Sequence, residues 1–144
     1  MSGNQRNWKI MIRICLSLLL IIFLTSDSIK LRVVVKNVQV GKGSVFVAVY
    51  NDEKNFLKKA FVEKKMASSN AQLECFFDLS KGEYAVVVYQ DINDNKKLDL
   101  GLFSIPKEPT GFSNNFHPRF SKPQFKDASI ELKEPSDTSI IELK

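Results

Sequence analysis

The sequence has few of the residues from which metal and redox centres are commonly built. Its 144 residues include one histidine, one tryptophan and two cysteines. With a single histidine no cluster of Cys and His ligands can form, so a zinc centre is not expected. Cys15 lies in an N-terminal apolar run, which leaves Cys75 alone in the remaining chain and excludes an internal disulfide there. An apolar core must therefore hold the fold together.

The sequence also lacks a concentrated basic patch. The net charge is +5, but residues 1–28 hold three basic residues and one acidic residue, which leaves +3 on residues 29–144. Lysine doublets such as Lys58-Lys59 and Lys96-Lys97 are scattered rather than gathered in one stripe with aromatic residues between them. We therefore expect no nucleic-acid partner.

A long apolar run is missing as well, since the longest covers only the eleven residues 14–24. A membrane-spanning helix needs about 20 apolar residues. The run follows the basic residues Lys9 and Arg13 and precedes the small polar segment 25–28, which is the order of a secretory signal. We therefore expect an N-terminal signal helix and export of the rest of the chain, to the periplasm or out of the cell.

Small residues at the −3 and −1 positions, Ser26 and Ser28, place the expected cleavage before Ile29. The prediction is a signal peptide over residues 1–28 and a single domain over residues 29–144. Contact with a membrane is then expected only through the leader, if it stays uncleaved. Met11 offers a second start site for a shorter signal.

Beyond the leader, apolar residues recur with the period of two that is typical of strands. Segments 31–36 and 45–50 alternate in this way, and the turn residues 41–43 between them predict a hairpin. Residues 53–65 carry apolar side chains at a spacing of four, which predicts a short helix.

Four later segments also have strand character. Segment 71–79 alternates and directs Cys75 toward the core, whereas segment 83–90 is apolar at nearly every position, as in a central strand covered on both faces. Segments 128–132 and 140–143 predict two more strands. The result is an all-β fold, an antiparallel β-sandwich of about seven strands, as in immunoglobulin-like domains.

A loop rich in Asp and Asn follows the central strand. Oxygen-bearing side chains occupy its positions 1, 3, 5 and 9, and the carbonyl of position 7 adds a fifth oxygen. Calcium prefers six to eight oxygen ligands, so this spacing predicts a weak calcium site. Its ligands would be Asp91, Asn93, Asn95, Lys97 and Asp99.

Two residues of this loop weaken the calcium interpretation. Lys96 stands where calcium loops usually have glycine, and Leu102 stands where a bidentate Glu would close the ligand shell. Asp and Asn also build tight turns without metal, because their side chains bond their own backbone. A metal-free turn is therefore the favoured interpretation, with calcium as the alternative.

Residues 101–125 form a long proline-containing stretch with five phenylalanines. We expect these rings to close one end of the sandwich, because exposing them all to water is unfavourable. The functional alternative is an aromatic platform for an unknown protein or small-molecule ligand. Its residues would be Phe112, Asn114, Asn115, Phe116 and Arg119.

Catalysis has little support in the sequence, so we expect a non-catalytic protein. The loop 111–117 contains Ser113 and His117, which are the candidate residues for a small secreted hydrolase. The segment begins like a nucleophile elbow but lacks its closing glycine. Hydrolase chemistry is therefore the alternative to a binding or envelope-associated module.

An ordered series of motifs lies between residues 82 and 128, within a resemblance that covers roughly residues 31–132. The motifs are Gly82-x-Tyr-Ala, Asp91-x-Asn-x-Asn-x-x-Leu-Asp99, Ile105-Pro-Lys-Glu108, Gly111-Phe-Ser-Asn-Asn115 and Pro123-x-Phe-x-x-Ala128. This series resembles a bacterial family of small exported proteins of unknown function. The resemblance implies a signal peptide and one β-sandwich of the transthyretin-like or prealbumin-like kind. In that family His usually stands in place of Gln90 and Gly in place of Lys96.

Overall fold

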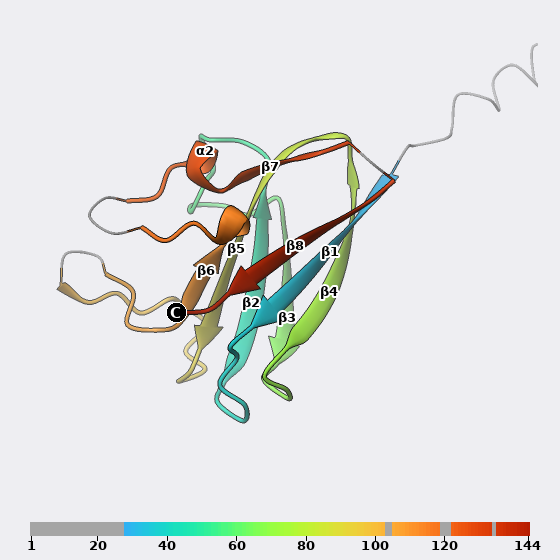
Figure 1. The fold of residues 1–144 in the computed structure, drawn as a ribbon. Helices are drawn as coiled ribbons and strands as arrows, with labels where there is room; N and C mark the ends of the chain where they lie inside the picture. The colour runs from blue at the N-terminus through green and yellow to red at the C-terminus, as the bar shows by residue number, and fades with distance from the viewer. Residues whose placement is uncertain (1–27, 103–104, 119–121, 134) are drawn as a thin grey trace, which may run out of the picture.

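A computed structural model describes residues 28–102, 105–118, 122–133 and 135–144, so the expected signal peptide lies outside the described residues. Eight strands form two sheets that pack face to face (Figure 1). The first sheet has the order β4-β1-β8, and the second has the order β3-β2-β5-β6 with β7 paired to β5. No helix in the described part of the chain is long and apolar enough to cross a membrane.

The first sheet contains β1 (Ser28–Lys36), β4 (Leu73–Ser80) and β8 (Ser136–Glu142). The second contains β2 (Ser44–Tyr50), β3 (Val62–Ala67), β5 (Gly82–Asp91), β6 (Thr110–Phe112) and β7 (Ser129–Leu132). Two short helical turns, η3 (Ser113–Asn115) and α2 (Phe125–Ala128), lie between β6 and β7. The predicted all-β sandwich is confirmed.

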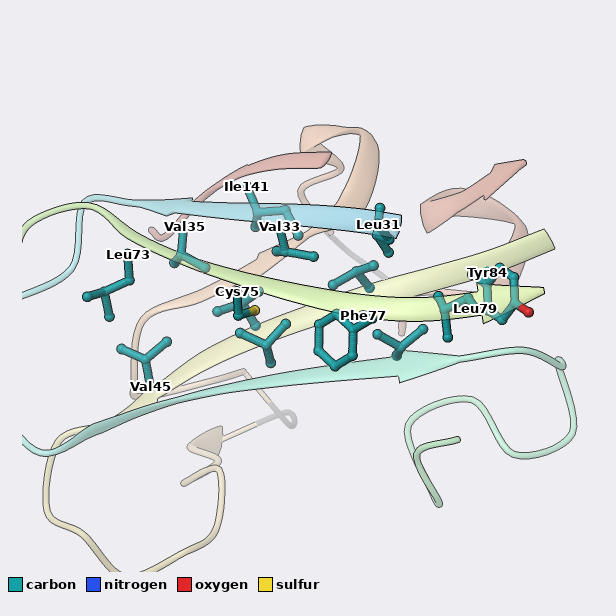
Figure 2. Packing of buried hydrophobic residues seen from close by; sticks show 14 of the residues in the cluster. Leu31, Val33, Val35, Val45, Leu73, Cys75, Phe77, Leu79, Tyr84 and Ile141 are labelled. Carbon is teal, nitrogen blue, oxygen red and sulfur yellow. The ribbon is translucent and has the colours of Figure 1, made fainter. Parts of the chain in front are cut away.

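The core between the sheets follows from the period-two pattern. Alternate residues of β4 are buried at Leu73, Cys75, Phe77 and Leu79, while their neighbours face outward. These side chains meet those of β1, β2 and β5 between the sheets (Figure 2). Cys75 lies among them as predicted, and burial raises the pKa of its thiol to about 11. Such a thiol stays protonated and unreactive at neutral pH.

The predicted hairpin of residues 31–36 with 45–50 is wrong. β1 pairs with β4 antiparallel and with β8 parallel, whereas β2 pairs with β3 and β5. The chain therefore crosses from one sheet to the other between β1 and β2. Alternation of apolar and polar residues indicates which face of a strand is buried. It does not indicate whether the next strand pairs with the first in the same sheet or lies opposite it in the other sheet.

The predicted short helix over residues 53–65 is also wrong. Residues 53–59 form turns, and Val62–Ala67 is the edge strand β3. Asp52 accepts a hydrogen bond from the Asn55 backbone N–H (2.8 Å), and Leu57 has a φ of 58°. A left-handed residue cannot continue a right-handed helix, so the spacing of four here reflects packing of Phe56 rather than helical periodicity.

A second apolar cluster covers the outer face of the five-stranded sheet. It includes the outward-facing neighbours of the inner core residues on β2 and β5, among them Tyr50 and Val87. Phe56, Phe112 and Phe125 cover this face, and the rings of Phe56 and Phe125 meet edge to face at 5.8 Å. The described rings therefore cover a sheet face, and the expectation that they close the end of the sandwich is wrong. Phe103 and Phe120 lie outside the described residues.

The turn before β5 ends in a tyrosine corner. The Tyr84 hydroxyl donates a hydrogen bond to the Ser80 carbonyl at 3.1 Å. Its ring is buried in the inner core, so the bond satisfies a hydroxyl that would otherwise lose its water. At the C-terminus, β8 begins at Ser136, four residues earlier than the strand expected over 140–143.

Candidate functional site

Two buried carboxylates fix the loop system that leaves β5. Asp91, the last residue of β5, is fully buried and accepts the backbone N–H groups of Asn95 (3.1 Å) and Lys96 (2.7 Å). This bonding turns the chain sharply after the strand. Lys96 has a φ of 64°, the conformation for which a glycine is better suited.

The second carboxylate, Glu108, lies just before β6 and is also buried. It accepts the backbone N–H groups of Ile92 (2.8 Å) and Asp99 (3.0 Å), which lie at the two ends of the Asp/Asn loop. A carboxylate that accepts two N–H groups satisfies donors that no strand partner reaches. Asp91 and Glu108 thus form the structural base of the loop system, where the loops leave the end of the sheet.

Gln90, next to Asp91, fixes the segment that crosses from one sheet to the other between β1 and β2. Its side chain is fully buried, accepts the Gln39 N–H at 2.9 Å and donates to the carbonyls of Gln39 and Lys42. Gly43 lies against the same strand end, where an added Cβ would be 1.8 Å from the Asp91 carbonyl oxygen. A side chain at position 43 would therefore push the segment that connects β1 to β2 away from Asp91 at the end of β5.

The predicted calcium ligands lie together in this loop, but they bond one another and the backbone. The Asp99 carboxylate accepts N–H groups from the side chains of Asn93 (2.7 Å) and Asn95 (3.0 Å). The amide oxygens of Asn93 and Asn95 accept the backbone N–H groups of Asn95 and Lys97. Within the described residues, no three His, Cys, Asp or Glu side chains are grouped to hold a metal. The bonds are those of an Asx-rich turn, and calcium binding stays a prediction.

The predicted aromatic platform is largely part of the second cluster. Phe112 is buried and its ring meets the half-buried Phe116 edge to face at 6.2 Å. Asn114 donates to the Ser129 carbonyl (2.7 Å), and Asn115 accepts the Glu142 N–H (3.3 Å). Arg119 lies outside the described residues. Among the platform residues that the structure describes, Phe112 has a packing role, Phe116 is partly exposed, and Asn114 and Asn115 are exposed.

An open groove beside these asparagines had no signal in the sequence. It has a volume of ≈ 550 Å³ and lies between the outer edges of β7 and β8. Asn114 and Asn115 line it together with Glu131, Asp137 and other residues of the two strands. Its existence depends on β7 and β8 lying in different sheets, which the sequence pattern does not reveal.

The hydrolase candidate Ser113 is fully buried. Its hydroxyl accepts the Val86 N–H at 2.9 Å and donates to the Ala128 carbonyl, so it joins β5 to the end of α2. His117 is partly exposed in the following loop. A nucleophile must reach its substrate, and a buried hydroxyl with both bonds made is placed for structure instead.

A hairpin whose described arms are residues 99–102 and 105–107 was not predicted, and these arms extend away from the sandwich (Figure 1, tan, left). Two backbone bonds define it, from Lys107 N–H to the Asp99 carbonyl (2.8 Å) and from Gly101 N–H to the Ile105 carbonyl (2.7 Å). Leu100, Leu102 and Ile105 are 53%, 77% and 62% exposed. Three exposed aliphatic residues between two lysine-bearing segments were the available signal.

These features define a class of protein: a two-sheet β-sandwich with a loop system fixed at one sheet end by buried polar side chains. Within this class, the chain belongs to the bacterial family described as "Uncharacterized protein conserved in bacteria (DUF2141)", whose family model matches residues 33–140. The match confirms the resemblance to a bacterial family of unknown function. No curated protein and no solved structure matches the chain.

Proposed function

We propose that the protein is an exported, non-catalytic binding module of the cell envelope, with its working face in the region 91–125. The N-terminal order of basic residues, short apolar run and small residues supports export. Cleavage before Ile29 would leave the strand β1 almost whole, because β1 begins at Ser28.

One observation carries the binding role: the exposed aliphatic side chains of the hairpin arms 99–102 and 105–107 lie beside a loop base that Asp91 and Glu108 fix. A monomeric soluble protein seldom gathers large apolar side chains on a projecting element unless they contact a partner. A fixed base also reduces the entropy lost on binding.

The positions of the candidate catalytic residues support a non-catalytic role. The Ser113 hydroxyl is buried and bonded, and the Cys75 thiol is buried with a raised pKa. His117 is the only histidine in the sequence, and neither Ser113 nor Cys75 is exposed to serve as its nucleophile.

The proposal is tested by fractionating cells and sedimenting the exported protein with washed envelopes. We expect the wild-type protein to begin at Ile29 and to sediment with envelopes. A pair of changes at the hairpin, Leu102→Ser with Ile105→Ser, should release it to the supernatant. The control pair Phe61→Ser with Ile140→Ser changes two other large exposed apolar residues and should leave sedimentation unchanged. Retention in the cytosol, or equal sedimentation of both pairs, would refute the proposal.

A further inference from the structure

The two open sides of the sandwich differ in how their strand edges are protected. β3 and β4 are the edge strands on one side, where Lys64 of β3 donates to the Phe76 carbonyl of β4 and lies over the Phe77 ring at 5.1 Å. A lysine in this position keeps another chain from pairing with the edge. On the other side, β7 and β8 diverge (Figure 1), and the open groove of ≈ 550 Å³ lies between them.

The bonds at the two ends of β8 show which of its backbone groups face this groove. At the start of the strand, the Lys30 N–H donates to the Pro135 carbonyl at 3.1 Å. At its end, the Leu143 N–H donates to the Lys36 carbonyl at 3.1 Å. Odd-numbered residues of β8 therefore bond β1 in the parallel ladder, and even-numbered residues direct their N–H and C=O groups away from it.

Two of the outward N–H groups of β8 already have side-chain partners. The Thr138 N–H donates to the Asp137 carboxylate at 2.8 Å, and the Glu142 N–H donates to the Asn115 amide oxygen at 3.3 Å. Ile140 lies between them, and its N–H and C=O have no partner among the residues that the structure describes. An unpaired N–H and C=O on one residue are the groups with which an added strand pairs.

β7 presents a similar edge to the groove. The Ser113 hydroxyl accepts the Val86 N–H on the side of β5 where β6 and β7 lie, so even-numbered residues of β5 face β7. Tyr84 thus bonds its partner Ile130, and the next residue, Glu131, directs its backbone N–H and C=O away from β5. Neither group has a partner within the described part of the chain.

The groove is also acidic. Glu131 and Asp137 line it, and none of the described lining residues is a lysine or arginine. Lys133 pairs with Glu131 at 2.8 Å, but the two side chains are 66% and 61% exposed. A pair so exposed to water contributes little and is readily exchanged. The two carboxylates therefore favour a positively charged ligand.

We infer that this groove binds an extended peptide that carries a lysine or arginine and adds as a strand to the β8 edge. A peptide residue opposite Ile140 exchanges two N–H···O bonds with it, and the basic side chain lies against Asp137 and Glu131. The groove volume falls within the usual range of ligand clefts, about 300–1,000 Å³. Pairing of two copies through this edge would bring their carboxylates together, so a second copy fits less well.

The inference goes beyond the proposed function, because it depends neither on export nor on the exposed hairpin. The probe is a displayed library of random linear heptapeptides, from which peptides that bind the whole protein are enriched and synthesised. We expect enriched peptides that contain lysine or arginine among β-branched residues. Their binding should slow hydrogen exchange at the Ile140 and Glu131 amides. The Phe76 amide faces outward on the opposite edge, since odd-numbered residues of β4 bond β1, and its exchange should be unchanged.

Backbone pairing is tested by Ile140→Pro, because proline is accommodated where the lost N–H faces away from the ladder. This change should weaken peptide binding by about two- to tenfold, as expected for one hydrogen bond, and Ile140→Val should preserve binding. Phe76→Pro removes an outward N–H from the opposite edge and should have no effect. Fluorescence anisotropy of labelled peptides measures these affinities.

The charge contribution is tested by Glu131→Gln with Asp137→Asn, which keeps an amide oxygen for the Thr138 N–H. We expect binding about fivefold weaker, since two exposed ion pairs are lost. The control pair Glu63→Gln with Asp78→Asn changes exposed acids elsewhere and should alter binding less than about twofold.

Failure to enrich any peptide, enriched peptides without basic residues, or equal binding by wild type and Ile140→Pro would overturn the inference. A concentration-dependent dimer that Ile140→Pro abolishes would also overturn it and assign the groove to a second copy. Melting temperatures separate loss of binding from loss of fold. If Ile140→Pro does not fold, the exchange rates of the wild-type Ile140 and Phe76 amides decide, and equal protection of both would contradict the inference.

Discussion

The sandwich and the loop system of residues 91–102 and 105–109 are stabilised by opposite kinds of buried contact. Between the sheets, alternate apolar side chains such as Val47 and Phe77 are removed from water. In the loop system the buried groups are polar, and Asp91 and Glu108 accept backbone N–H groups that have no strand partner. The difference means that the loops need few apolar residues for their own stability. Leu102 and Ile105 consequently stay exposed.

The largest expected effect is in the core. Phe77→Ala should lower the free energy of unfolding by about 3–5 kcal/mol, because a buried aromatic side chain leaves a cavity. Its neighbour Phe76 points out of the sandwich and is 45% exposed, so Phe76→Ala should cost less than about 1 kcal/mol. Urea denaturation of the two variants measures both. Similar costs would mean that the alternation along β4 does not define the core.

A smaller and local effect is expected at the loop base. Glu108→Ala removes the acceptor of the Ile92 and Asp99 N–H groups and should cost about 1–3 kcal/mol. Hydrogen exchange should accelerate at these two amides and stay slow at Val47 and Val88 in the strands. Glu131→Ala, at an exposed carboxylate, is the matched control. Uniform acceleration across the strands would show that the loop system and the sandwich are one cooperative unit.

These two regions also differ in how far the sequence could predict them. The inner face of β4 follows from alternation alone, because a period of two fixes which side chains share a face. The partner of β1 does not follow, since its parallel pairing with β8 joins segments about 100 residues apart. The tyrosine corner at Tyr84 was predictable because its hydroxyl bonds a residue only four positions away.

The candidate site was predictable only where its contacts are local. The Asp/Asn spacing correctly indicated a tight loop whose side chains bond its own backbone. The role of Glu108 depends on the return of the chain to β6, and the burial of Phe112 depends on α2 packing against the sheet. No local sequence pattern indicates either of these contacts. The exposed hairpin was missed because aliphatic residues in a loop resemble core residues until the packing is known.

A still smaller effect tests the strain in the loop. Lys96 has a φ of 64°, where a residue with a Cβ is disfavoured. Lys96→Gly should raise the free energy of unfolding by about 0.5–1 kcal/mol, because relief of strain exceeds the greater freedom of glycine in the unfolded chain. Thermal denaturation measures the change, with Lys97→Gly as the control. A loss of stability would show that the Lys96 side chain has a structural role.

The smallest expected effect concerns calcium. The oxygens of Asp91, Asn93, Asn95 and Asp99 already accept hydrogen bonds, so the favoured metal-free turn gains little from an ion. We expect the same melting temperature in EDTA and in excess calcium, because a ligand that does not bind the native state cannot stabilise it. A rise with calcium that Asp99→Ala removes would establish the alternative interpretation.

The central proposal, that the exposed aliphatic side chains of the hairpin contact a partner in the cell envelope, is tested most directly by a single tryptophan. Trp8 is the only tryptophan of the sequence, so Leu102→Trp in a Trp8→Phe background places one probe at the hairpin. We predict that washed envelopes move its emission to shorter wavelength, because a bound partner removes the ring from water. Phe61→Trp in the same background should not respond to envelopes. An unchanged spectrum for Leu102→Trp, or equal responses at both positions, would contradict the claim.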